Sequence, residues 1–263
     1  MSEKILQVKG LKVYFNAPSG VVRAVDGVSF DVERRSVFGL VGESGSGKTL
    51  TALSILGLIG PPGKIAGGGI YFDDMDLIKE DEKILRGIRG ARIAMVFQEP
   101  SRAFNPVFTI GYQITESALT HQELDRKKAE SLAIEFLEKV HIPDPKKIYH
   151  DYPHQLSGGA KQRAMIAMAL VNSPELIILD EPTTALDVTI QAQILDLLKE
   201  IIEKERLSIL FISHDFGIVS RMCDSIAVMH KGRIVEAGIT KDILSRPNEP
   251  YTISLLESVK ALL

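Results

Sequence analysis

The stretch "VFGLVGESGSGKTLTAL" constrains the fold of this chain more than any other. Gly42, Gly47, Lys48 and Thr49 fill the pattern G-x-x-x-x-G-K-[ST]. A short apolar run precedes the glycines and a helical pattern follows them, which is the context that a phosphate-binding loop needs. Glycines let successive backbone N–H groups point at one phosphate, and the following helix adds the positive end of its dipole. The sequence therefore predicts a strand–loop–helix unit built to bind phosphate.

Each residue of this loop is a candidate contact for a nucleotide: Gly42, Glu43, Ser44, Gly45, Ser46, Gly47, Lys48, Thr49 and Leu50. We expect Lys48 to hold the β- and γ-phosphates as a point charge, and the Thr49 hydroxyl to ligate Mg²⁺. The alternative is a glycine-rich turn without a ligand, which the strand and helix on either side disfavour.

Composition excludes several classes of protein. The chain has 263 residues, 45% hydrophobic and 25% charged, as in an ordinary folded protein. A net charge of -3 gives no sign of nucleic acid binding, and a single cysteine excludes an internal disulfide framework. No apolar run has the length of a membrane span, and the charged start lacks a signal-peptide core. We therefore expect a cytoplasmic protein that reaches a membrane only through a partner.

Hydrophobic patterns predict two kinds of sheet. Segments that alternate apolar and polar residues predict an antiparallel, half-exposed sheet: 5–15 and 22–33. Short continuous apolar runs, separated by helical patterns, predict strands of a buried parallel sheet: 37–41, 92–98, 175–182 and 207–215. A further segment, "SIAVMHKGRIVEAG", predicts a hairpin that turns at "KG". From about residue 100 to 172, between the second and third of the buried runs, the chain has only helical patterns.

This order predicts an α/β fold with an inserted lobe. We expect residues 1–99 and 173–245 to form the nucleotide-binding core, including the antiparallel β subdomain. Residues 100–172 would form the helical lobe, and residues 246–263 a helical tail.

Polar residues end several of the buried strands. Asp180 and Glu181 follow one strand, Gln98 another and His214 a third. The carboxyl ends of parallel strands meet at one edge, so these side chains would converge with Lys48 on one phosphate. Asp180 could accept hydrogen bonds from Mg²⁺-bound water, and Glu181 could polarise a water for attack. The alternatives are a helix N-cap for the acidic pair and structural roles for the histidine and the glutamine.

At this point the order of motifs becomes informative: "GESGSGKT", "FQEP", "LSGGAKQ", "LIILDEP", "TTALD" and "SHD". In this order they resemble the nucleotide-binding subunit of an ATP-binding-cassette (ABC) transporter, and the resemblance covers essentially the whole chain. It implies a P-loop NTPase core with a parallel sheet, an N-terminal antiparallel β subdomain and an inserted α-helical lobe. It also implies ATP hydrolysis with Mg²⁺.

The resemblance implies roles for single residues of the core. Thr49 and Gln98 would approach Mg²⁺ with Asp180 behind it. Glu181 would be the general base, and His214 would contact the γ-phosphate. Lys48 and Gln98 would complete the catalytic set.

Further roles follow from the same resemblance. Phe15 would stack on adenine, with Tyr14 as the second candidate and a packed strand residue as the alternative for Phe15. Asp187 would communicate across a dimer. In "LSGGAKQ", which has Ala160 where methionine or glutamine is more usual, the nucleotide contacts would be Ser157, Gly158, Gly159 and Gln162. They would form an anion-binding helix start that faces the nucleotide of a second subunit.

The finer resemblance is to the oligopeptide, dipeptide and nickel importers, carried above all by "DVTIQAQIL" and "PYT". It implies an ATPase that energises di- or oligopeptide uptake from the cytoplasmic face of the membrane; nickel or another small solute is the alternative. The implied partners are a second ABC ATPase subunit (identical or, more commonly, related), two transmembrane permease subunits and, indirectly, an extracytoplasmic solute-binding protein. Nucleic acid is not among them. Phe104, Val107 and Phe108 would dock on the permease, or else belong to the core of the lobe.

Many peptide-importer subunits continue past "PYT" into a cysteine-rich extension that resembles an iron–sulfur segment. With one cysteine, Cys223, this chain should hold no cluster. Three other classes remain as alternatives: a soluble ABC ATPase of DNA repair or translation, a regulatory cassette without catalysis, and a small-molecule kinase. The motifs "LSGG" and "TALD" have no role in a kinase, and a full set of catalytic residues disfavours the regulatory cassette.

Overall fold

A computed structural model of the chain describes residues 3–18, 20–184 and 186–260. It divides into two compact units. Unit 1 comprises Met1–Leu85 with Ser208–Leu263, and unit 2 comprises Arg86–Leu207. In the described part of the chain, no helix is long and apolar enough to cross a membrane.

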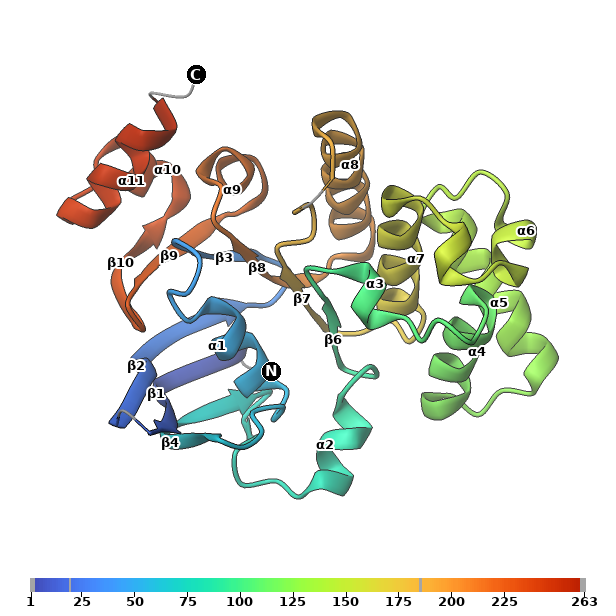
Figure 1. Cartoon of the computed structure of the whole chain (residues 1–263), viewed down its shortest axis with the longest axis horizontal. Helices are drawn as coiled ribbons and strands as arrows, with labels where there is room; N and C mark the ends of the chain where they lie inside the picture. The colour runs from blue at the N-terminus through green and yellow to red at the C-terminus, as the bar shows by residue number, and fades with distance from the viewer. Residues whose placement is uncertain (1–2, 19, 185, 261–263) are drawn as a thin grey trace. The chain divides into compact units, whose positions relative to one another are not determined.

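Unit 1 contains the predicted antiparallel sheet (Figure 1). Its strands lie in the order β2 (Gly20–Glu33), β1 (Lys4–Ala17), β4 (Gly63–Phe72) and β5 (Met75–Asp76). Apolar residues on one face of β1 and β2 are almost fully buried, as the alternating pattern requires. Helix α1 (Lys48–Ile55) packs against both strands.

Unit 1 also contributes strands to a second sheet, in the order β10 (Arg233–Ile239), β9 (Ser225–His230), β3 (Val37–Val41) and β8 (Ser208–Ser213). β3 pairs in parallel with β8 and β9, and every residue of β3 and β8 is buried. β9 and β10 form the predicted antiparallel hairpin, with Lys231 and Gly232 at positive φ in its turn. The helices that follow in this unit are α9 (Phe216–Met222), α10 (Thr240–Ser245) and α11 (Pro250–Lys260).

Unit 2 pairs two parallel strands, β6 (Ile93–Val96) and β7 (Leu176–Asp180). The lobe helices lie between them in sequence: α3 (Pro100–Ala103), α4 (Ile110–His121), α5 (Arg126–Lys139), α6 (Pro145–His150), a 3₁₀ turn (Pro153–Gln155) and α7 (Gly158–Leu170). The amphipathic α8 (Val188–Glu205) follows β7. Figure 1 shows α4 to α7 gathered into one helical cluster.

The helical patterns expected near residues 106–121, 126–140, 158–171 and 189–205 correspond to α4, α5, α7 and α8. Helix α2 (Glu82–Ile88) was not predicted, because its seven residues are too few to establish a helical period. The domain boundaries expected from the sequence stay a prediction.

Candidate functional site

The loop between β3 and α1 needs its glycines for steric reasons. Gly42 has φ 155° and Gly47 φ 107°, conformations that side chains disfavour. A Cβ atom on Gly42 would lie 2.1 Å from the backbone oxygen of Met229, and one on Gly47 would lie 2.6 Å from that of Ala24. Neighbouring backbone therefore fixes the curl of this loop.

The Lys48 side chain lies inside that curl. Only 4% of the residue is exposed. Its Nζ donates to the backbone oxygens of Gly42 at 2.7 Å and Glu43 at 2.8 Å, and contacts Ser46 Oγ at 3.4 Å. The loop thus gathers a buried positive charge, while Glu43 and Thr49 on its outer side are exposed. Such an arrangement suits an anion that approaches from solvent.

The two candidates for the adenine contact differ in their surroundings. Tyr14 donates its hydroxyl to Asp26 Oδ1 at 2.8 Å, and Arg233 donates to the other oxygen of Asp26 at 2.7 Å. Its hydrogen bond to the carboxylate raises the pKa of Tyr14 above its ordinary value. Phe15 is half-buried and its ring covers Gly63, where a Cβ atom would come within 2.5 Å of the ring. Tyr14 is therefore held in a polar cluster, and Phe15 remains the better candidate for stacking.

His214 lies between β8 and α9. It is exposed, so its ring can be reached from solvent. The next residue, Asp215, caps α9 by accepting from the backbone N–H of Gly217 at 2.7 Å. The sequence placed the histidine at the end of a strand, and the structure agrees.

In unit 2, two of the predicted catalytic residues meet. Gln98 Nε2, just after β6, donates to Glu181 Oε2, just after β7, at 3.0 Å. Thr184 Oγ1 donates to the same oxygen at 2.9 Å. Sequence reasoning missed Thr184, although a hydroxyl three residues after an acid is a signal for a local hydrogen bond. Two donors therefore fix the orientation of one carboxylate.

The helix-cap alternative for the acidic pair is wrong. Asp180 is the last residue of β7 and is 2% exposed. Glu181 has φ 46°, an uncommon backbone conformation for a residue with a side chain. The cap of α8 is instead Asp187, whose Oδ1 accepts from the backbone N–H of Ile190 at 2.9 Å. The acidic pair thus does not begin the helix.

The stretch "LSGGAKQ" begins α7. Ser157 is the N-cap, and its hydroxyl accepts from the backbone N–H of Ala160 at 3.3 Å. Ser157 and Gly158 are exposed, and Gly159 is half-buried with Ile190 beside it. The helix start therefore faces solvent in the single chain, as the sequence predicted.

Gln162 differs from the rest of this stretch. It is 1% exposed, so its side chain lies in the interior of unit 2. Its amide nitrogen finds no hydrogen-bond partner among the described residues. The structure does not support the expected direct nucleotide contact for Gln162.

The three candidate docking residues differ in their exposure to solvent. Phe104 is 3% exposed and belongs to the core, as the alternative reading allowed. Val107 is 69% exposed and Phe108 42%. The Phe108 ring stacks on Tyr112 of α4, with 4.8 Å between ring centroids. Sequence pattern alone could not distinguish these neighbours, because the turn between α3 and α4 has no helical or strand period.

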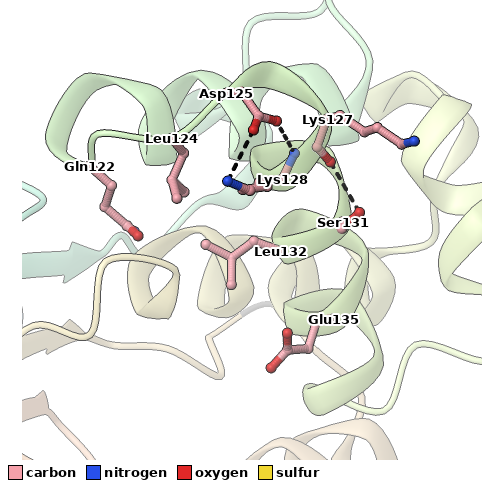
Figure 2. Close-up of a pocket in the computed structure, with 8 residues that line it drawn as sticks. All are labelled: Gln122, Leu124, Asp125, Lys127, Lys128, Ser131, Leu132 and Glu135. Atoms are coloured by element: carbon pink, nitrogen blue, oxygen red, sulfur yellow. Dashed lines mark hydrogen bonds and ion pairs between the residues drawn. The ribbon is translucent and has the colours of Figure 1, made fainter.

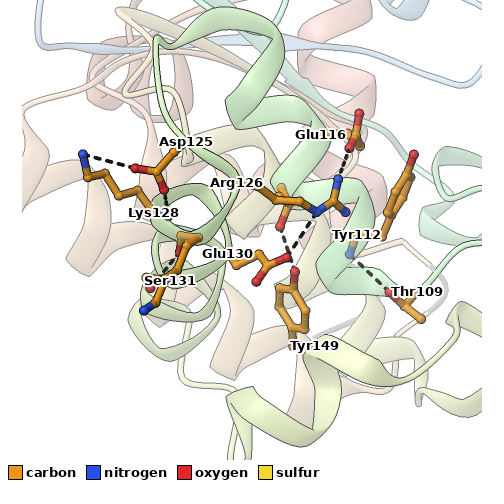
Figure 3. Close-up of polar contacts among 11 residues, drawn as sticks. Thr109, Tyr112, Glu116, Asp125, Arg126, Lys128, Glu130, Ser131 and Tyr149 are labelled. Atoms are coloured by element: carbon orange, nitrogen blue, oxygen red, sulfur yellow. Dashed lines mark hydrogen bonds and ion pairs between the residues drawn. The ribbon is translucent and has the colours of Figure 1, made fainter.

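A polar cluster joins α4 and α5 around Tyr112, the residue on which Phe108 stacks (Figure 3). The guanidinium of Arg126, at the start of α5, lies 5.6 Å from the centre of the Tyr112 ring. It also pairs with Glu116 of α4 at 3.4 Å and with Glu130 of α5 at 3.2 Å. These contacts link α4 to α5 beside Tyr112, on which Phe108 stacks.

A shallow groove of about 480 Å³ runs along the start of α5 (Figure 2). Its polar groups are engaged by the helix itself. Asp125 accepts from the backbone N–H of Lys128 at 2.9 Å and pairs with its Nζ at 3.3 Å, and Ser131 donates to the Lys127 carbonyl at 3.0 Å. These contacts cap and brace α5.

Comparison with known proteins agrees with the motif order. A family model described as "ABC transporter" matches residues 25–184. The dipeptide transport ATP-binding protein DppD of Bacillus subtilis is 49% identical over 99% of this chain and 78% of its own length. The oligopeptide transport ATP-binding protein OppD of the same organism is 45% identical over 98% of this chain and 73% of its own length. DppD of Escherichia coli is 45% identical over 97% of this chain and 78% of its own length.

Solved structures agree on the fold. The dimeric bacterial ABC transporter cassette MJ0796 is 25% identical, with a TM-score of 0.80 over 89% of this chain and 98% of its own. The cbiO1 protein of Clostridium perfringens, part of the transporter complex cbiONQ, is 28% identical, with a TM-score of 0.77 over 93% and 92% of the two chains. The chain therefore belongs to the ABC transporter family, among its ATP-binding proteins.

Proposed function

We propose that this chain hydrolyses ATP as a subunit of an ABC importer and thereby drives uptake of dipeptides or oligopeptides. One observation carries the hydrolytic part: the carboxylate of Glu181 is oriented by both Gln98 and Thr184. The names of the relatives, which are 45 to 49% identical over nearly the whole chain, support the solute class.

The proposed chemistry assigns one task to each residue. Glu181 takes a proton from the attacking water, and Lys48 offsets charge on the phosphates. His214, exposed after β8, contacts the γ-phosphate.

A magnesium ion is implied by the family. The proposed ligands or near neighbours are Thr49, Gln98 and Asp180, which offer hydroxyl, amide and carboxylate oxygens, the hard donors that Mg²⁺ prefers. The exposed Thr49 at the start of α1 and the strand-end position of Asp180 fit that use. When bound, the ion would neutralise charge on the phosphate oxygens.

The exposed start of α7 supports a nucleotide shared by two subunits. Ser157 and Gly158 present the positive end of a 13-residue helix to solvent. We propose that this end faces the nucleotide bound by a second ABC ATPase subunit, with Asp187 nearby in the same interface. ATP then favours the closed dimer and hydrolysis releases it, because the nucleotide binds one state more tightly than the other.

The exposed pair Val107 and Phe108 is the proposed contact with the transmembrane permease subunits. Such a contact would hold the protein at the cytoplasmic face of the membrane. A buried Phe104 excludes that residue from the contact.

The test uses the assembled transporter in vesicles with its binding protein. Glu181→Gln keeps an oxygen that can accept from both donors but removes the base, so hydrolysis should fall by about 10² to 10⁴-fold at unchanged ATP affinity. Glu203→Gln, the same change on an exposed turn of α8, should leave hydrolysis unchanged. Normal turnover by the Glu181 variant would refute the base, and uptake of nickel but not of dipeptides would refute the solute.

A further inference from the structure

The start of α11 contacts the phosphate loop. The backbone N–H of Glu43 donates to the Tyr251 hydroxyl at 3.4 Å. The Tyr251 ring stacks on His230, the last residue of β9, with 3.8 Å between centroids and 3° between ring planes. The two residues that meet, Glu43 and Tyr251, are 208 positions apart in the chain.

This contact holds one residue of the loop from two sides. Glu43 receives the Lys48 Nζ on its carbonyl oxygen at 2.8 Å, and its N–H donates to Tyr251. The turn of the β9–β10 hairpin holds the next part of the loop. There the backbone N–H of Gly232 donates to the backbone oxygen of Ser46 at 2.9 Å. Since Glu43 and its two following residues are exposed, little packing supports them otherwise.

Tyr251 is itself fixed by a buried carboxylate. Glu236 of β10 is 9% exposed and accepts from the backbone N–H of Asn248 at 2.8 Å and of Glu249 at 3.3 Å. These N–H groups lie just before α11, so the carboxylate fixes where the helix begins. Thr252, the residue after the tyrosine, is fully buried. The backbone at Tyr251 is therefore fixed where its ring stacks on His230.

The hydroxyl of Tyr251 stays neutral near physiological pH. Burial raises the pKa of Tyr251 above its ordinary value. A neutral hydroxyl accepts a hydrogen bond from the loop without placing a negative charge beside the phosphates.

We propose that Tyr251 is a positioning residue for nucleotide binding: by holding the Glu43 peptide, it keeps the phosphate loop in its binding shape. This inference rests on the proposed function. A loop that is ordered in advance loses less conformational freedom when the nucleotide binds, and so binds more tightly. α11 thereby sets the affinity of a site to which it contributes no phosphate contact.

The experiment measures the affinity of the full-length chain for a fluorescent ATP analogue. Tyr251→Phe keeps the ring on His230 and removes the hydroxyl. Since this hydrogen bond is long, its loss should raise the Kd for the nucleotide by about threefold. That factor corresponds to the lower end of the free energies that neutral hydrogen bonds contribute. Tyr251→Ala, which also loses the stack, should raise the Kd by about tenfold or more. The matched control is Tyr71→Phe, on β4.

Two further readouts separate positioning from general destabilisation. In the assembled transporter, Tyr251→Phe should raise the KM for ATP at unchanged kcat, because the hydroxyl touches no reacting atom. The melting temperature without nucleotide should match that of Tyr71→Phe. A Kd equal to wild type, or a lower kcat at unchanged KM, would overturn the inference while leaving ATP binding by the wild-type chain intact. Failure of the wild-type chain to bind the analogue would overturn the proposed function as well.

Discussion

The steric role of Gly47 gives a prediction whose size follows from the structure. Gly47 is the N-cap of α1, with φ 107° and ψ 3°. A Cβ atom there would lie 2.6 Å from the backbone oxygen of Ala24, which belongs to β2 and cannot rotate away as a side chain could. Gly45, two residues earlier, also has positive φ, 79°, but a Cβ atom there would meet nothing within 4 Å. Comparing substitutions at the two glycines therefore separates the cost of backbone strain from the cost of a steric clash.

The expected magnitudes differ accordingly. Gly45→Ala should cost about 1–2 kcal/mol, the penalty of a left-handed conformation for an L-residue. Gly47→Ala adds the cost of overpacking, about 1–3 kcal/mol, for a total of roughly 2 to 5 kcal/mol with a midpoint of about 3.5 kcal/mol. At about 2–4 °C per kcal/mol for chains of this size, the melting temperature should fall by about 10 °C for Gly47→Ala and by about 4 °C for Gly45→Ala.

Thermal unfolding of the nucleotide-free protein, followed by far-UV circular dichroism, measures both shifts. Nucleotide is left out because it would add its own stabilisation and mask the difference. Equal shifts for the two variants would refute the reasoning, since they would show that the Ala24 carbonyl does not restrict position 47.

Two other predictions concern an exposed site and a buried carboxylate. Ser157→Arg should leave ATP binding by the single chain unchanged in a nucleotide titration. It should abolish hydrolysis by the assembled transporter, because the exposed helix start would meet a second subunit. A loss of ATP binding by the single chain that matches the loss of hydrolysis would contradict a site shared by two subunits. For Glu236, burial raises the pKa, but the N–H groups of Asn248 and Glu249 outweigh it and leave the pKa below its ordinary value. Its stabilisation is therefore complete above the ordinary pKa, about 4.3, and is lost as the pH falls through the lower folded value. Glu236→Gln should accordingly show a shallower loss of melting temperature below about pH 5 than wild type, and a steeper loss would contradict the assignment.

Local patterns predicted the parts of the fold that depend on neighbouring residues. The run at 37–41 corresponds to β3 residue for residue, because a short continuous apolar run before a glycine-rich loop suits a strand buried on both faces. The turn at Lys231 and Gly232 was equally readable, since both residues need positive φ. The phosphate loop belongs to the same class only in part: its glycines have positive φ in the loop itself, but the backbone that crowds Gly42 and Gly47 comes from β9 and β2.

Burial was harder to predict than secondary structure. Phe104 and Phe108 are both phenylalanines in an irregular segment, yet the first is buried and the second exposed. Gln162 lies four residues after the exposed Gly158, a spacing that puts both on one side of a helix, and yet Gln162 is buried. A motif states which residues recur together, and not which of them faces the ligand. For Gln162 the burial of the side chain decides that question, since only 1% of the residue is exposed.

The contacts that the sequence could not supply are those between distant segments. Nothing near Tyr251 indicates that its hydroxyl meets Glu43, because the contact depends on where Glu236 starts α11 and where His230 ends β9. The same limit explains why the sequence left a helix cap open as the role of the acidic pair: only the observed cap, Asp187, excludes it. With Asp187 as the cap, the hydrogen bonds that Gln98 and Thr184 donate to Glu181 support the catalytic role proposed for this carboxylate.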